Sequence, residues 1–168
     1  MKKNNLLYTF GFTLIELMVV VAIIAFLSMI AAPRFLNFLA KAKRTEAYLN
    51  LSSIYTAQKV YWAENGTYST MLNGPGSVGW QPEGKTYYSY GFPGQANKNF
   101  FEGKWAGPKD ALSKAKADKN SFTVVATAYI KDEKNPDTLM INEKNEITIV
   151  NDGISPSSSK QQKDNLIV

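Results

Sequence analysis

The chain has 168 residues, of which 45% are hydrophobic, and a formal net charge of +5 at pH 7. It contains no cysteine and no histidine, which excludes disulfide bonds, thiol nucleophiles, Ser-His and Cys-His catalysis, and the usual zinc and haem ligands. Without the first eleven residues 17 basic and 14 acidic residues remain, so the net charge falls to +3, which is too small to indicate a nucleic-acid-binding protein by itself. The length suits one domain plus an appendage, and the composition predicts a protein that is not an enzyme and needs no cofactor.

The apolar residues are concentrated near the N-terminus. From Phe12 to Ala32 there are 21 residues, and Glu16 is the only charged residue among them. A run of this length can span a bilayer as a helix. A carboxylate inside such a run is energetically costly and therefore indicates a function.

Four interpretations of residues 1–33 compete. A secretory signal needs a small-x-small cleavage site after the run, but a cut after Ala32 would leave Pro33 as the first mature residue, which is unfavourable. A lipoprotein signal needs a cysteine. A plain membrane anchor fits the length but gives Glu16 no role beyond lying near an interface. In the fourth interpretation a short basic leader ends at Gly11 and is cut off before Phe12, which accounts for every feature.

The stretch GFTLIELMVVVAIIAFLSMIAAP, residues 11–33, closely resembles the signature shared by type IV prepilins and type II secretion pseudopilins. The resemblance extends over residues 8–65 and covers the remainder in general layout. It implies that a prepilin peptidase cuts between Gly11 and Phe12, that the new Phe12 amine is N-methylated, and that the apolar helix stays in the mature protein.

The resemblance also implies a role for Glu16 in assembly. Its carboxylate would pair with the Phe12 amine of a neighbouring subunit and set the register, since removing one partner of a buried ion pair costs about 3–5 kcal/mol. The alternative is that Glu16 only reaches toward the membrane interface, as charged side chains near helix ends often do.

The charges that follow the apolar run favour the opposite orientation. Arg34, Lys41, Lys43 and Arg44 come after it, and the positive-inside rule would place that side in the cytoplasm. The pilin signature requires the reverse, and we give the specific signature precedence over the charge count.

Helix-forming residues continue past Pro33 to Asn65, and Pro33 is expected to kink the helix because it lacks a backbone N–H. Between residues 47 and 62 apolar side chains recur at spacings of three, four and seven, which predicts a face packed on a sheet. That face comprises Ala47, Tyr48, Leu51, Ile54, Tyr55, Tyr61 and Trp62. The residues largely outside it are Arg44, Asn50, Ser53 and Glu64.

The rest of the chain predicts a loop-rich head with a sheet. Strands are expected in residues 86–92 and 121–130, a hairpin in residues 137–153 turning at 143–145, and a short surface helix in residues 108–119. The expected fold is therefore α+β, with about four antiparallel strands packed on the C-terminal half of a long N-terminal helix. This is the layout of a pilin. Many pilins also have a cysteine pair that closes the C-terminal loop, and because this chain has none, the hairpin and tail are expected to close that edge.

The expected segments are a removed leader (1–11), a transmembrane and filament-core helix (12–33), the amphipathic half of the same helix (34–65), a globular head (66–154) and a flexible polar tail (155–168).

Two groups of charged residues raise the question of further binding sites. Asp132, Glu133 and Asp137 could suggest calcium, but their spacing is not that of an EF-hand, and no metal is expected. The six lysines from Lys98 to Lys119 are interleaved with acidic residues. A solvated surface is therefore favoured over DNA binding, which needs a clustered basic face.

The resemblance implies a structural subunit that forms a homopolymer, the type IV pilus, for adhesion, twitching motility or DNA uptake. Its implied partners are the prepilin peptidase and an inner-membrane assembly platform driven by an ATPase. The chain would begin as a single-pass inner-membrane precursor and end in an extracellular filament. Two alternatives stay open: a type II secretion pseudopilin, and a membrane-anchored binding protein that does not polymerise.

Overall fold

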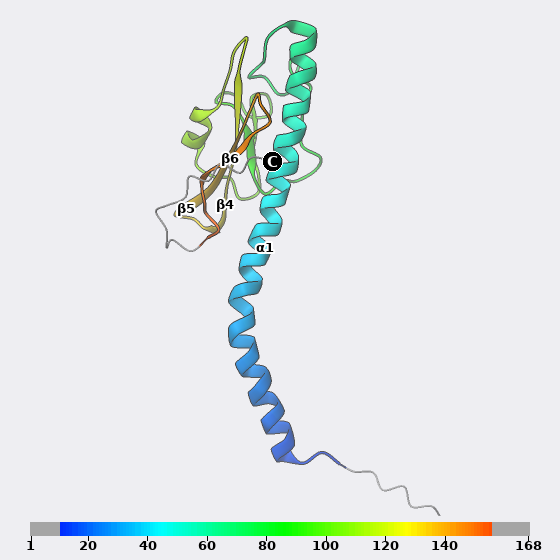
Figure 1. Ribbon diagram of the computed structural model, residues 1–168, viewed down its shortest axis with the longest axis vertical. Helices are drawn as coiled ribbons and strands as arrows, with labels where there is room; N and C mark the ends of the chain where they lie inside the picture. Colours follow the sequence, from blue (N-terminus) through cyan, green and yellow to red (C-terminus); the bar gives the residue numbers. More distant parts are fainter. Residues whose placement is uncertain (1–10, 156–168) are drawn as a thin grey trace, which may run out of the picture. The chain divides into compact units, whose positions relative to one another are not determined.

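The computed structural model describes residues 11–155 and confirms the α+β fold, with one long N-terminal helix and an antiparallel sheet (Figure 1). Residues 1–10 of the expected leader and residues 156–168 of the expected tail lie outside the described part. The chain forms two compact units, Met1–Leu36 and Asn37–Val168. The elements in chain order are α1 (Leu14–Asn65), β1 (Ser89–Gly91), β2 (Phe100–Phe101), the 3-10 helix η1 (Lys109–Lys114), β3 (Lys116–Ala117), β4 (Phe122–Asp132), β5 (Asn135–Asn142) and β6 (Ile147–Asn151).

The first unit holds the apolar start of α1. Every residue from 11 to 36 is exposed, although most of these side chains are apolar. By length and composition α1 can cross a membrane. A helix that is apolar on all sides needs lipid or protein around it. Pro33 lies inside α1, so the helix continues through it, and the kink expected there stays a prediction.

The second unit contains the sheet, with the strand order β2-β1-β4-β5-β6 and β3 beside β4. All of these pairs are antiparallel. The β5–β6 hairpin turns between Asn142 and Ile147, in agreement with the expected turn, and Asn145 adopts the left-handed conformation there at φ 65°. Asparagine tolerates this conformation better than most residues.

The sheet has two more strands than the four or so that we expected, within the residues that the structure describes. These are β2 and β3, which are two residues long. A pair of residues cannot show the alternation by which a strand is recognised in a sequence. The surface helix expected in residues 108–119 is present only in part, as the 3-10 helix η1 directly after Pro108, because Lys116–Ala117 of that range form β3.

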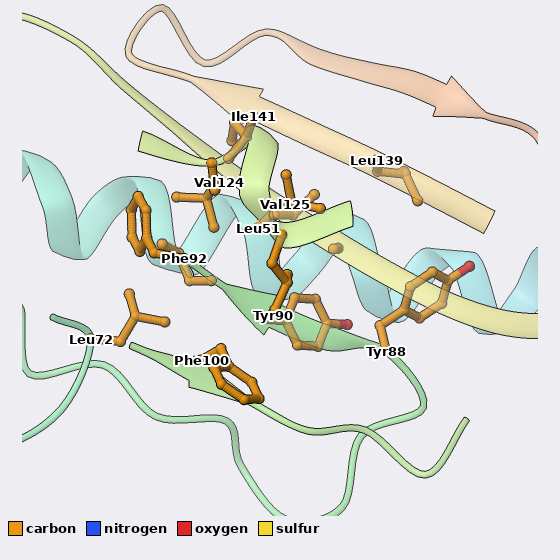
Figure 2. Close-up of a cluster of buried hydrophobic side chains, with 14 of the residues drawn as sticks. Leu51, Leu72, Tyr88, Tyr90, Phe92, Phe100, Val124, Val125, Leu139 and Ile141 are labelled. Atoms are coloured by element: carbon orange, nitrogen blue, oxygen red, sulfur yellow. The ribbon is translucent and has the colours of Figure 1, made fainter. Parts of the chain in front are cut away.

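The core of the second unit lies between α1 and the sheet. Leu51 and Ile54 of α1 are fully buried together with Tyr88, Tyr90 and side chains of β4 and β5. Figure 2 shows Leu51 in this cluster, beside Val125 and Tyr90. Five consecutive β4 residues, 124–128, are buried, so both faces of this strand are covered.

Candidate assembly site

The first turn of α1 is closed by a capping box of Thr13 and Glu16. The backbone N–H and the hydroxyl of Thr13 donate to Oε2 of Glu16 at 3.2 and 3.0 Å, and the backbone N–H of Glu16 donates to the Thr13 hydroxyl oxygen at 3.3 Å. These bonds satisfy donors that a helix start leaves without partners. The negative charge also suits the positive end of the helix dipole. Sequence reasoning missed this role, although the spacing in TLIE, residues 13–16, fits the S/T-x-x-E pattern.

The expected cleavage point lies just before this cap. A Cβ added to Gly11 would meet nothing within 4 Å, and Phe12 is 85% exposed. The hydrogen bonds that the Glu16 side chain accepts from residues 11–155 all use Oε2. The Gly11–Phe12 peptide is therefore accessible, and Oε1 of Glu16 remains available for a further donor.

The half of α1 in the second unit has two opposite faces. One is buried, at Arg44, Ala47, Leu51, Ile54 and Gln58. The other is exposed and carries no charged residue from residue 38 to residue 63, and we call it the uncharged face. It comprises Phe38, Ala42, Thr45, Leu49, Ser52, Thr56, Val60 and Ala63. Exposed helix faces in soluble proteins are normally charged or polar, so an uncharged face of this length suits packing against another helix.

The six side chains predicted to form the helix–sheet core occupy different depths. Leu51 and Ile54 are fully buried, and Tyr48 and Tyr55 pack on the core while partly exposed. The remaining two, Tyr61 and Trp62, lie outside the core cluster.

The polar atoms of Tyr61 and Trp62 explain their position outside the core. The Tyr61 hydroxyl donates to the Gly76 carbonyl at 3.3 Å, and the Trp62 indole N–H donates to the Lys119 carbonyl at 3.1 Å. Tyrosine and tryptophan need such partners when they pack on protein. Here they cover loops near the end of α1 instead of filling the interior.

Two charged residues lie deeper than the sequence suggested. Arg44, expected outside the apolar face, is buried, and Asp137, considered as a calcium ligand, is fully buried with it. The Nε and Nη2 atoms of Arg44 donate to the two carboxylate oxygens of Asp137 at 2.8 and 2.5 Å. Arg44 lies seven residues before the buried Leu51, which places both on the same face of α1. This spacing could have indicated that Arg44 is buried. The described residues contain no group of three or more acidic side chains placed to hold a metal ion.

The lysines from Lys98 to Lys119 are all exposed, and so are the three acidic residues between them, Glu102, Asp110 and Asp118. Positive and negative groups are therefore mixed on this surface.

Residues 8–32 match the family described as the prokaryotic N-terminal methylation motif. The type IV major pilin protein PilA of Myxococcus xanthus (strain DK1622) is 49% identical over 80 residues, which cover 48% of this chain and 35% of PilA. Prepilin peptidase-dependent protein D of Escherichia coli (strain K12) is 41% identical over 68 residues, or 40% of this chain and 47% of that protein. The type IV major pilin protein PilE1 of Neisseria gonorrhoeae is 35% identical over 74 residues, or 40% of this chain and 45% of PilE1.

The chain thus spans between 35% and 47% of the length of these curated relatives. The pilins among them are structural proteins, which agrees with the expectation that this chain is not an enzyme. With its methylation motif, its long apolar N-terminal helix and these relatives, the chain is similar to type IV pilins over its N-terminal half.

Proposed function

We propose that this chain is the subunit of a type IV pilus, which polymerises through α1 into a surface filament. The observation that carries the proposal is the exposed surface of α1, which is apolar apart from Glu16 and Ser28 in residues 14–32 and is uncharged along one face in residues 38–63. Removing such a surface from water is strongly favourable. A bilayer can cover the first part, and neighbouring copies of α1 can cover both parts in a filament.

Processing would come first in this scheme. The prepilin peptidase would cut the accessible Gly11–Phe12 peptide, and methylation of the Phe12 amine would keep its positive charge. The chain would remain in the inner membrane as a single-pass protein until an assembly platform, driven by an ATPase, extracts it. The filament would then serve adhesion, twitching motility or DNA uptake outside the cell.

Glu16 would guide each subunit into register. Thr13 holds one oxygen of its carboxylate, and the other is left for the Phe12 amine of a neighbour. An unpaired carboxylate in apolar surroundings is costly, so the pair would favour one position of the incoming helix over positions shifted along the axis.

The variant Glu16→Gln separates the pairing role of Glu16 from its capping role. Glu16→Gln keeps an oxygen that can accept the Thr13 bonds, since Glu and Gln both complete a capping box, but it removes the charge. We expect Glu16→Gln cells to contain processed subunit in the membrane and no extracellular filaments. The control, Glu64→Gln, makes the same change at an exposed position near the other end of α1 and should assemble normally. Normal filament yield from Glu16→Gln would contradict the pairing role.

A further inference from the structure

A buried carboxylate, that of Asp137, joins four segments of the second unit. Its Oδ2 accepts from Nε of Arg44 at 2.8 Å and from the Tyr88 hydroxyl at 2.6 Å. Its Oδ1 accepts from Nη2 of Arg44 at 2.5 Å and from the backbone N–H of Gly153 at 3.0 Å. The same Nη2 donates to Oδ1 of Asp152 at 2.5 Å. The Asp137 centre, as we call these five residues, thus connects α1, the residue before β1, β5 and the segment after β6.

The Asp137 centre is closed to solvent at its inner end. Asp137 has no exposed surface and the Arg44 side chain is only 10% exposed, whereas the Asp152 side chain is 39% exposed. A carboxylate offers about four acceptor positions, and all four are used on Asp137. Burial disfavours the charged guanidinium, but the hydrogen bonds and charge of Asp137, and then of Asp152, outweigh this and raise the pKa of Arg44.

The residues from Asp152 to Ser155, which we call the C-terminal segment, form a turn organised by their own first side chain. Oδ1 of Asp152 accepts from the N–H groups of Ile154 and Ser155, each at 3.0 Å, and Oδ2 accepts from the Ser155 hydroxyl at 2.7 Å. Gly153 fits where a larger residue would not, because a Cβ there would lie 2.5 Å from the Asp137 backbone nitrogen. The turn is therefore organised by Asp152 and lies directly on β5.

The C-terminal segment has few attachments to the rest of the unit. Two of them pass through the Asp137 centre, from Arg44 to Asp152 and from Gly153 to Asp137. A third joins the Asn135 side-chain amide to the Asp152 carbonyl at 3.1 Å. The fourth, from the Lys131 ammonium to the Ile154 carbonyl, is 3.3 Å long. The buried side chain of Ile154 is the fifth attachment.

We propose that Arg44 is a latch that holds the C-terminal segment against α1, and that this segment detaches as a unit while the sheet stays folded. The chain has no cysteine with which to close this edge covalently, so the closure depends on this ion pair together with the hydrogen bonds and the buried Ile154. Because Ser155 leads into residues 156–168, the latch also fixes the point on the head from which the rest of the chain continues. The proposal concerns the single subunit and does not depend on filament assembly.

Amide hydrogen exchange on the full chain in detergent micelles at neutral pH tests the latch. Asp152→Asn removes the partly exposed charge that Arg44 holds, and Arg44→Lys keeps a positive charge but loses the planar fork that binds two carboxylates. In both variants we expect the amide of Gly153, which donates to Asp137 and not to Asp152, to exchange at least tenfold faster, which reports local opening. The amides of β4 should keep their wild-type rates. Arg34→Lys, the same substitution at an exposed arginine of α1, should change neither region.

Two results would overturn the proposal. Unchanged exchange at the Gly153 amide of Asp152→Asn would show that Ile154 and the remaining hydrogen bonds hold the segment without Arg44. A rise in β4 exchange equal to that in the segment would show that the Asp137 centre belongs to one cooperative core. Asp152→Asn decides between these outcomes even if Arg44→Lys does not fold.

Discussion

Thr13 donates two hydrogen bonds to a single carboxylate oxygen of Glu16 across the first turn of α1. The backbone N–H of Glu16 donates in return to the Thr13 hydroxyl oxygen. Glu16 is thus a helix cap within its own chain while its second oxygen stays available to another molecule. A charge that is costly in an apolar helix therefore has a local partner, Thr13, before assembly. The amine of a neighbouring subunit would be its second partner.

The cap itself can be removed without changing the charge. Thr13→Ala deletes the hydroxyl and should destabilise the helix start by about 1 kcal/mol, the usual loss on replacing a Thr cap by Ala. We expect the amides of residues 14–17 to exchange faster in micelles, while filaments still form because the Glu16 charge remains. The measurement is hydrogen exchange together with filament yield. Abolished assembly in Thr13→Ala would show that capping, and not the charge of Glu16, is what the filament requires.

The uncharged face of α1 predicts an assembly defect without a folding defect. Leu49 is 68% exposed, so Leu49→Lys should leave the unfolding midpoint of the head almost unchanged. A charge buried between packed helices is costly, and we expect filament yield to fall at least tenfold. Thr148→Lys places the same charge on exposed β6 and serves as the control. The prediction fails if both variants give wild-type amounts of sheared filaments.

Two leucines on the same helix provide a matched test of the core. Leu51 is fully buried and Leu49 is exposed. Leu51→Ala should lower the free energy of unfolding by about 2–5 kcal/mol, because it removes apolar contacts and leaves a cavity. Leu49→Ala should change it by less than about 0.5 kcal/mol. Urea unfolding followed by tryptophan fluorescence measures both, and equal losses would contradict the assigned faces of α1.

The C-terminal segment should weaken in acid. Partial burial disfavours the Asp152 carboxylate, but hydrogen bonds from Ser155 and then from Arg44 prevail, so the pKa of Asp152 lies below its ordinary value. A carboxyl group with a lowered pKa stabilises the fold above its unfolded pKa of about 3.9, and this contribution is lost as the pH falls further. Asp137 and Lys131 also contact this region, through the Gly153 N–H and the Ile154 carbonyl.

We therefore expect the urea midpoint of the wild type to stay level from pH 7 to pH 5 and to fall below about pH 4. Asp152→Asn should start lower at pH 7 and lose less between pH 4 and pH 2, since it lacks this titration. Parallel pH profiles for the two proteins would show that Asp152 contributes nothing to the acid dependence.

Local patterns in the sequence predicted much of the fold. The helical spacing of the apolar residues around Leu51 and Ile54 identified the buried face of α1, and the apolar runs identified β4 and the β5–β6 hairpin. Periodicity gave the wrong depth for Trp62, because an indole N–H binds more readily to a loop carbonyl than to a dry interior. The strands β2 and β3 are two residues long, which is too short to show the alternation of a strand in the sequence.

The Asp137 centre could not be predicted in the same way. Arg44 and Asp137 are 93 positions apart, and each belongs to a stretch of charged residues that resembles solvated surface. Whether a charge is buried depends on the partner that the tertiary fold supplies, and no local window contains both. At the N-terminus the situation is reversed, since both partners of the capping box lie within four residues.

The most direct test of the account is the intact mass and N-terminal fragmentation of the protein in a sheared extracellular fraction. We predict an abundant species that begins at Phe12 and is one methyl group heavier than its sequence. The same processed species confined to the membrane would favour a pseudopilin over a pilus subunit. A chain that still begins at Met1 would contradict cleavage after Gly11 and, with it, assembly through a free Phe12 amine.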